Sequence, residues 1–386
     1  MDDLRVPMPR LTRLSSLVAV LSMCACGGDR VSAPTGTPSP TPPPQHRLLA
    51  VTDDSIESFT VDAVDGHLSP APRMTPGSRS SAAVVMPSGD HLYVTTLNGL
   101  EGFRMNATSG VLTSLAGSPY AQRVFGLSLA PSGAFLYSYT SQRAIVAFRV
   151  EPSGALVEVG RTAGAQFQTP VEVEPGGRYA YGFGNFSLTG YRVEASGVLT
   201  ALPGSPYPLP STDPNAGGLR MARVGPFFYV LSQGAGASRP GGILVYRFDA
   251  LTGIPEQVAR YGAPEERVPS AVDISPSGGT LYVSFRPRLV TDAAPVYVQA
   301  FAVDGSTGLL GPTGRLDVGQ SIFSLMRVSP DGRGLFLTLE PSRFDEPFPP
   351  TQVAAVRLDA AGQPAAVAGQ PQSAGLFPHS LLSFAR

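Results

Sequence analysis

Short runs of alternating apolar and polar residues, separated by turns rich in Pro, Ser and Gly, recur along most of this chain. One copy has a turn at Pro87–Gly89, a strand at His91–Thr96, a second strand at Leu100–Met105 and a turn at Thr108–Gly110. Alternation with a period of two is typical of half-buried β-strands, and glycine permits the positive φ of tight turns. The pattern predicts short strands throughout, and no ten-residue amphipathic helix is expected.

This unit repeats along the chain at a regular spacing. The turn prolines of five copies are Pro87, Pro131, Pro175, Pro276 and Pro330. Two weaker copies, Leu48–Val51 and Phe228–Val230, lack the Pro-Gly turn. The copies follow one another at a period of about 44 to 54 residues, a span typical of four-stranded propeller blades. Seven copies therefore predict an all-β, seven-bladed β-propeller.

The two ends of the repeat region are complementary. The region begins in a second strand of a blade, His46–Thr52, with no first strand before it, and Phe377–Ala385 reads as a lone first strand. The C-terminal strand is therefore expected to pair into the first blade, close the ring and remove exposed sheet edges. Loss of Leu376–Arg386 is predicted to cripple folding.

The N-terminal segment, residues 1–26, has the plan of a secretory signal. Three arginines precede the apolar run Leu14–Met23, which is too short to span a bilayer. The cysteines at its end make it similar to a bacterial lipoprotein signal. Cys26 is the better lipidation candidate because Ala25 supplies the small preceding residue, and Cys24 stays open. The alternative is an ordinary cleaved signal with incidental cysteines.

Residues 27–45 are rich in Pro, Thr, Ser and Gly and predict a disordered tether, followed by a propeller over residues 46–386. If Cys26 is processed, the mature chain has no other cysteine and no intramolecular disulfide. The lipidated cysteine would make the lipid bilayer a partner and place the protein in the cell envelope, on the periplasmic or outer-surface side. A monomer is expected.

Composition narrows the function classes. The chain of 386 residues has 28 Lys+Arg and 29 Asp+Glu, a net charge of −1, so it lacks the basic balance of a nucleic-acid-binding protein. It shows no ligand spacing for zinc, no calcium loop and no phosphate-binding glycine loop. We therefore expect no metal and no cofactor.

One histidine lies where chemistry could occur. His379 stands at the start of the C-terminal first strand, which is expected at the mouth of the central channel. A histidine there could act as a general base on water. The alternative is a hydrogen-bonded structural histidine of the closing strand.

Several arginines stand at the same level of their blades. They are Arg79, Arg123, Arg220 and Arg267. If they converge on the channel mouth they form a site for a carboxylate or phosphate, which guanidinium groups bind in a bidentate manner. Glu265 and Glu266 would partly offset this charge. The alternative is that they are solvated loop residues.

Connections between second and third strands are long in the last three blades. They run over Gln233–Gly241, Arg286–Pro295 and Glu340–Thr351. Long loops on a rigid scaffold often carry binding sites. Arg286, Arg343 and Phe344 are the contact residues expected there, although loop variation without function is the alternative.

The repeats resemble the lactonase-type seven-bladed propeller family, the 6-phosphogluconolactonase-like proteins, over roughly Leu48 to Arg386. Ala83–Val94 looks like that family's hairpin of first and second strands, and Ile145–Val150 looks like its third strand. Gly110–Thr113 with Gly117–Tyr120 is similar to exported bacterial members. The resemblance implies hydrolysis or formation of a sugar lactone.

The family commonly places a histidine inside the first strand of a blade, shortly before the turn proline. The corresponding positions here are Ala82, Gly126, Pro170, Ala271 and Leu325, none of which transfers protons. Only Pro378-His379 keeps this feature. The sequence therefore favours an exported, lipid-anchored scaffold that binds an envelope protein or an anionic small molecule on its loop-rich face. A lactone hydrolase using His379 and a purely structural envelope protein are the alternatives.

Overall fold

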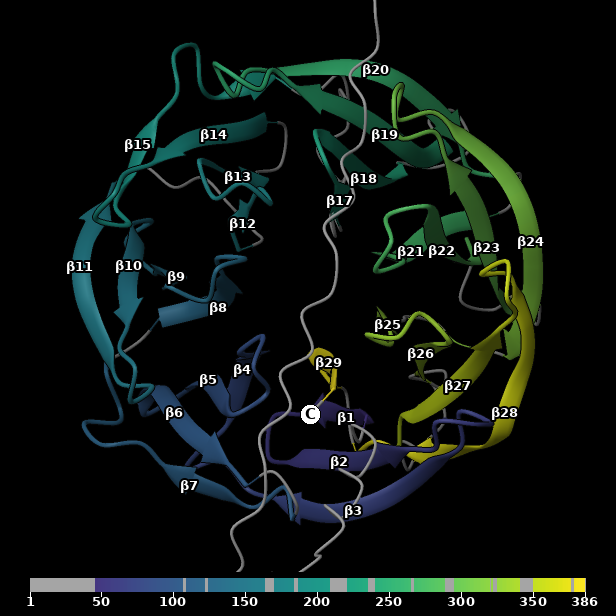
Figure 1. The fold of residues 1–386 in the computed structure, drawn as a ribbon, viewed down its shortest axis with the longest axis horizontal. Coiled ribbons are helices and arrows are strands. Elements are labelled where there is room, and N and C mark those ends of the chain that lie inside the picture. Colours follow the sequence, from purple (N-terminus) through teal and green to yellow (C-terminus); the bar gives the residue numbers. More distant parts are fainter. Residues whose placement is uncertain are drawn as a thin grey trace, which may run out of the picture. The chain divides into compact units, whose positions relative to one another are not determined.

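The described part of the chain is a ring of seven antiparallel sheets (Figure 1). The computed structural model describes residues 46–386 except 107–108, 122–123, 164–169, 184–186, 209–220, 235–239, 265–266, 289–294, 320, 322–324, 341–349, 376–377 and 386. Six of these sheets have four strands each, and the sheet of the fourth blade has a short fifth strand in addition. The predicted all-β, seven-bladed propeller is confirmed.

From the axis outward, the strands of the first four blades are as follows. Blade 1 contains β29 (Ser380–Ala385), β1 (His46–Val51), β2 (Ile56–Val61) and β3 (Leu68–Met74). Blade 2 contains β4 (Ser80–Val85), β5 (His91–Thr96), β6 (Gly99–Met105) and β7 (Leu112–Ser114). Blade 3 contains β8 (Val124–Leu129), β9 (Phe135–Thr140), β10 (Ile145–Val150) and β11 (Leu156–Thr162). Blade 4 contains β12 (Glu172–Val173), β13 (Tyr179–Phe183), β14 (Ser187–Val193), β15 (Leu199–Ala201) and the added β16 (Tyr207–Pro208).

The last three blades have longer strands. Blade 5 contains β17 (Met221–Val224), β18 (Phe227–Gly234), β19 (Pro240–Phe248) and β20 (Pro255–Gly262). Blade 6 contains β21 (Arg267–Ile274), β22 (Thr280–Pro287), β23 (Val296–Val303) and β24 (Leu310–Gly319). Blade 7 contains β25 (Met326–Val328), β26 (Gly334–Leu339), β27 (Gln352–Leu358) and β28 (Pro364–Ser373).

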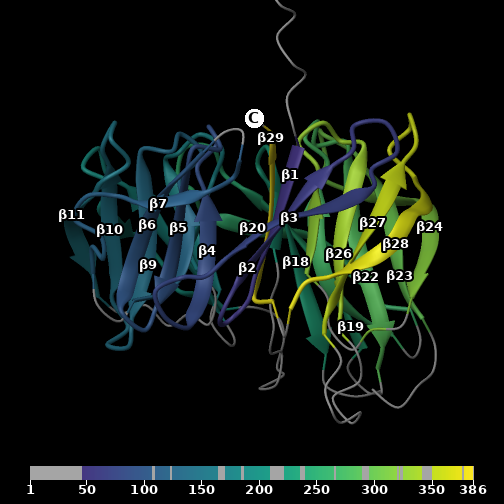
Figure 2. The same ribbon diagram turned by 90° about the horizontal axis from the view of Figure 1, so that it is seen from below.

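The C-terminal strand closes the ring as the sequence predicted. β29 pairs with β1 along its whole length, from Val51 opposite Ser380 to His46 opposite Ala385. Figure 2 shows the two strands side by side. Blade 1 is thus built from both ends of the described chain.

Two expected loop boundaries were wrong. β18 and β19 extend to Gly234 and Pro240, so Gln233 and Gly241 belong to strands. Arg286 lies in β22, opposite Val268, and not in a connection. In both places the ladder of paired residues extends beyond the apolar core, to Gly234 opposite Pro240 and to Arg286 opposite Val268. No described helix is long and apolar enough to span a membrane.

The hydrophobic core is divided among the interfaces between blades. Seven clusters of buried residues occur in the described chain, and each joins two neighbouring blades. The cluster between blades 7 and 1, for example, contains Phe336 together with Leu48 and Phe59. Burial of the sheet faces against each other therefore depends on a complete ring.

Tyrosines of the second strands connect five of the interfaces. Each tyrosine hydroxyl donates a hydrogen bond to the carbonyl of a turn glycine in the next blade. The pairs are Tyr93 with Gly154, Tyr137 with Gly197, Tyr181 with Gly253, Tyr229 with Gly308 and Tyr282 with Gly362, at 2.7–3.1 Å. We call these the inter-blade tyrosine bonds. They explain why Tyr recurs in the repeat.

Candidate functional site

The first strands of all seven blades surround a cavity of about 520 Å³ on the axis of the ring. These strands are the innermost ones in Figure 1. The wall includes residues of every blade, among them Ser81, Ser128, Glu172, Met221, Ala271, Arg327 and His379. We call it the central cavity.

His379 lies at the wall of the central cavity, as the sequence predicted. Its backbone N–H donates to the carbonyl of Val51 (2.9 Å). Its Nε2 lies 3.0 Å from Ser80 Oγ, and its Nδ1 lies 3.1 Å from Ser380 Oγ. Both ring nitrogens are therefore engaged by serine hydroxyls.

The partners of the two serines identify the tautomer of His379. Ser80 donates its only hydroxyl hydrogen to the carbonyl of Thr52, so it can only accept from Nε2. Nε2 therefore carries the ring hydrogen, and Nδ1 is the acceptor in the neutral ring. Ser380 Oγ accepts from the backbone N–H of Ala83 (3.2 Å) and donates to Nδ1. A continuous chain of hydrogen bonds thus crosses the closure of the ring.

Electrostatics favour the neutral form of His379. Burial lowers the pKa of His379, while the carboxylate of Asp53 and the backbone of Thr52 partly oppose this shift. Asp53 is in turn paired with Arg79, whose side chain is 70 % exposed. At neutral pH the imidazole can accept a proton at Nδ1.

The family's histidine position is occupied by Ser380 and not by His379. Ala82 lies opposite Thr95 and Ala271 opposite Ser284, two residues beyond Tyr93 and Tyr282. In blade 1 the equivalent pair is Ser380 with Val51. Ser380 lines the central cavity together with Ala82, Gly126, Pro170, Ala271 and Leu325. His379 therefore stands one residue before the position to which the resemblance pointed.

A second polar region of the central cavity was missed by the sequence analysis. Glu172 and Arg327 line the cavity, and Asp273 lies beside Arg327, with Asp273 Oδ2 to Arg327 Nη1 at 4.0 Å. Burial raises the pKa of Glu172, and Arg223 and Arg327 oppose the shift. Burial likewise raises the pKa of Asp273, against the effect of Arg327.

Arg327 connects this region to the closing strand. Its Nε donates to the carbonyl of Leu381 in β29 (3.0 Å), directly after Ser380. The carboxylate of Asp273 is itself fixed beside Arg327, because it accepts from the backbone N–H groups of Val328 (2.8 Å) and Ile274 (2.9 Å). A guanidinium group is thus positioned on the cavity wall beside β29, bonded to the residue that follows Ser380.

The repeat contained a signal for these charges. Glu172, Asp273 and Arg327 each stand three residues before a turn proline, opposite Tyr181, Tyr282 and Phe336. The same position holds Val84 in blade 2 and Ser128 in blade 3. Comparing this one position across the copies distinguishes the blades that have a charged side chain there from those that do not.

The described arginines of the predicted anion site each have a local partner. Arg267 donates to the carbonyl of Pro295 (2.6 Å) and lies over the ring of Tyr297. Arg286 donates to the carbonyl of Pro287 (3.2 Å), and burial lowers its pKa. Neither they nor Arg79 lines the central cavity. Their role in anion binding stays a prediction.

The remaining predicted site residues lie outside the described residues. They are Arg123, Arg220, Arg343, Phe344, Cys24 and Cys26. In the described chain, no group of three or more His, Cys, Asp and Glu side chains is arranged to hold a metal ion.

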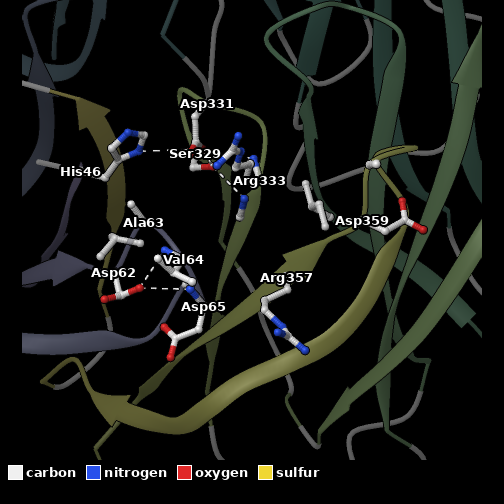
Figure 3. Close-up of a pocket in the computed structure, with 15 residues that line it drawn as sticks. His46, Asp62, Ala63, Val64, Asp65, Ser329, Asp331, Arg333, Arg357 and Asp359 are labelled. Carbon is white, nitrogen blue, oxygen red and sulfur yellow. Dashed lines mark hydrogen bonds and ion pairs between the residues drawn. The ribbon is translucent and has the colours of Figure 1, made fainter. Parts of the chain in front are cut away.

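A smaller pocket of about 270 Å³ lies between blades 7 and 1 (Figure 3). In blades 2 to 5 the ring that begins the second strand packs on the turn glycine of the next blade, as His91 does on Gly154. The corresponding residue of blade 7 is Gly334, and Phe336 lacks the hydroxyl of an inter-blade tyrosine bond. Gly334 lines the pocket, whose wall also includes His46 and Asp331, with His46 Nδ1 3.8 Å from Asp331 Oδ1.

Comparisons with known proteins agree with the architecture. No family model matches the chain, and no curated protein matches it. The structure is similar to a periplasmic gluconolactonase of Pseudomonas aeruginosa, with a TM-score of 0.68, 21% identity, and coverage of 88% of this chain and 99% of that one. It is also similar to a protein of Bacteroides fragilis provisionally assigned as a 6-phosphogluconolactonase, with a TM-score of 0.66, 17% identity, and coverage of 90% and 99%.

A third similar structure is a protein of unknown function from Desulfotomaculum acetoxidans, with a TM-score of 0.63, 13% identity, and coverage of 88% and 98%. At these identities the similarity shows the fold. The chain is therefore a seven-bladed propeller structurally similar to gluconolactonase and 6-phosphogluconolactonase proteins.

Proposed function

We propose that this protein hydrolyses a lactone, of the sugar-lactone class, in the central cavity. The observation that carries the proposal is the neutral His379, held at the cavity wall with Nδ1 as a proton acceptor. Structures similar over nearly their whole length include a gluconolactonase, which supports this choice over a pure binding scaffold.

The residues of the cavity fit the steps of lactone opening. His379 takes a proton from the attacking hydroxyl group and returns it to the ring oxygen that leaves. Arg327 is the cation on the same wall that can stabilise the negative charge developing on the carbonyl oxygen. Ser81, Ser128 and Tyr139 provide hydroxyl groups that suit a polyhydroxylated substrate.

The test is a lactone panel that includes glucono-1,5-lactone, assayed with the full chain and with His379→Ala. Loss of a general base is expected to lower kcat/KM by about 10²–10⁴-fold. The matched control is His67→Ala, since His67 does not line the central cavity. The proposal is wrong if no lactone is turned over above background, or if His379→Ala keeps full activity.

Binding on the loop face is the second candidate function. β22 ends at Pro287 and β23 begins at Val296, whereas β5 and β6 are separated only by Leu97 and Asn98. A similar separation follows β26, which ends at Leu339 before β27 begins at Gln352. In this case Arg343 and Phe344 would contact the partner. Shortening the chain between Glu340 and Thr351 should then abolish capture of an envelope protein without affecting lactone turnover.

Export and lipid anchoring are part of the proposal. The charged and apolar plan of residues 1–26 supports a lipoprotein signal with Cys26 or Cys24 as the lipidated residue. Metabolic labelling with a fatty acid should mark the wild-type chain and be lost in one of the variants Cys26→Ser and Cys24→Ser. Labelling retained in the double variant would contradict anchoring at these cysteines.

A further inference from the structure

We infer that Ser380 is the nucleophile of this reaction and forms a covalent acyl-enzyme. The inference rests on the proposed function. It is suggested by the hydrogen bonds around His379, which leave one acceptor nitrogen on the ring and place one hydroxyl group on it.

The acceptor nitrogen of His379 is already occupied. Because Nε2 donates to Ser80, a proton can be accepted only at Nδ1, and Ser380 Oγ lies 3.1 Å from that atom. A water molecule could be activated there only after displacing the serine. The serine hydroxyl is therefore the group that His379 is arranged to deprotonate.

The remaining contacts match those of an activated nucleophile. Such a site needs a nucleophile within reach of a base, and a third group that orients the base. Ser80, which is 4 % exposed, orients the imidazole and is itself held by the carbonyl of Thr52. The backbone N–H of Ala83 accounts for one lone pair of Ser380 Oγ and directs the hydroxyl hydrogen towards Nδ1. Ser380 also lines the central cavity, so a substrate can reach it.

The chemical steps balance. Ser380 Oγ attacks the lactone carbonyl while its proton moves to His379 Nδ1, and a C–O ester bond to the protein forms. The ring C–O bond breaks, and the leaving alkoxide takes the proton from the imidazolium. Water then attacks the acyl-enzyme, giving its proton to Nδ1, and Ser380 leaves with that proton. The net reaction consumes one lactone and one water and yields one hydroxy acid.

The test uses diisopropyl fluorophosphate on the full chain, followed by mass spectrometry of the peptide that contains Ser380. We expect a single phosphoryl adduct on Ser380 in the wild type and no adduct in Ser380→Ala. Labelling should slow by at least tenfold in His379→Ala. Lactone turnover by Ser380→Ala should fall by about a thousandfold or more.

The matched control is Ser132→Ala. Ser132 lies in an exposed turn of blade 3 and does not line the central cavity, and its hydroxyl accepts from the backbone N–H of Ala134. It should keep both labelling and turnover. Labelling of the wild-type chain does not depend on any variant folding, so it tests the inference even if Ser380→Ala is unstable.

The outcomes separate this inference from the proposed function. If His379→Ala loses turnover but Ser380→Ala retains it and no adduct forms, Ser380 is not the nucleophile and the hydrolase proposal survives. If no lactone is hydrolysed, both fail.

Ser80 is a positioning residue whose role has its own readout. Ser80→Ala removes the acceptor that stabilises the protonated ring, so the acid limb of the kcat/KM profile should move to lower pH. A purely structural role would lower activity without moving this limb.

Discussion

At the scale of single residues, the hydroxyl of Ser80 determines which nitrogen of His379 carries hydrogen. A serine has one hydrogen to donate, and Ser80 gives it to the carbonyl of Thr52. The same His379 in a solvated loop would exchange both tautomers. The hydrogen bond between Ser80 and His379 thus fixes the orientation of the ring, and burial favours its neutral form by lowering its pKa.

Arg79 is expected to act on His379 through Asp53. The carboxylate of Asp53 raises the pKa of His379, and Arg79 is paired with that carboxylate. In Arg79→Gln the pKa of His379 should rise, because Asp53 is no longer balanced. The acid limb of the kcat/KM profile should then move to higher pH. The shift will be small because Arg79 and Asp53 are 70% and 48% exposed.

The measurement is the pH dependence of kcat/KM for the best lactone of the panel. Arg149→Gln is the control, since Arg149 (54% exposed) forms a surface pair with Glu151 in blade 3, away from His379. A limb that stays in place in Arg79→Gln, or moves to lower pH, would contradict the coupling.

Arg327 should stabilise the fold in a pH-dependent way. Burial raises the pKa of Asp273 above that of the unfolded chain, so its ionisation costs stability as the pH rises through the folded pKa. Arg327→Ala raises that pKa further, and it should lower the free energy of unfolding by about 1–2 kcal/mol at neutral pH. At acidic pH, below that raised pKa, Asp273 is protonated and the loss should be smaller. Arg327 is 49% exposed, which keeps the loss below that of a fully buried pair.

Unfolding in urea at the two pH values measures this difference. Arg315→Ala is the control because its pair with Asp317 is exposed on both sides. An equal loss at both pH values would show that Arg327 acts through packing alone.

At the scale of strands and sheets, neighbouring blades are joined by one repeated contact. The hydroxyl of a tyrosine in the second strand donates a hydrogen bond to a turn carbonyl of the next blade. That carbonyl lies outside the strands, so it has no partner in a strand ladder. Blade 7 has Phe336 in this place, so the inter-blade tyrosine bond is absent there. In blade 1 the equivalent residue is Leu49, and the side chain of Arg47 approaches Gly110 of blade 2 instead.

Tyr181→Phe should lower the free energy of unfolding by about 1–3 kcal/mol, because the buried carbonyl of Gly253 loses its donor. Tyr207→Phe is the control, since its hydroxyl bonds to Pro203 within one exposed turn. Urea unfolding of the two variants measures the difference. Equal stability of both variants would mean that the inter-blade bond adds nothing to the packing of the ring.

The strands were predictable from the sequence because each blade repeats the same alternation and the same turn. β5 has the expected bounds, and β6 begins at Gly99, one residue earlier than expected. The site was only partly predictable. His379 could be placed at the cavity because it begins the closing strand. The contact between Ser80 and His379 could not be predicted, because the two residues are 299 positions apart in the sequence. A repeat of turns and strands does not show which side chains of different strands meet.

At the scale of the whole molecule, the closing strand has two roles. β29 supplies six ladder pairs to blade 1 and also carries Ser380 directly after His379. Its apolar residues Leu381 and Phe384 belong to the interfaces of blade 1 with blades 7 and 2. Stability and the proposed chemistry therefore depend on the same few residues.

A chain that ends at His379 should fail to unfold cooperatively at the wild-type temperature. It loses the inner strand of blade 1, so β1 becomes an exposed edge and two hydrophobic clusters open. Thermal unfolding followed by circular dichroism measures this. A chain that ends at Ala385 keeps all of β29 and is the control. A wild-type melting curve for the shorter chain would show that β29 is dispensable for ring closure.

The hydrogen-bond chain from Thr52 through Ser80 and His379 to Ser380 also sets an order in time. Thr52 and Ser80 precede His379 and Ser380 by 299 residues or more, so a ribosome makes the two halves of the chain of hydrogen bonds at different times. Chains that stop before His379, or are cut there by a protease, hold only half of the arrangement. If Ser380 is the nucleophile, hydrolysis begins only after β29 has been made and has paired with β1, and activity becomes a direct reporter of an intact closing strand.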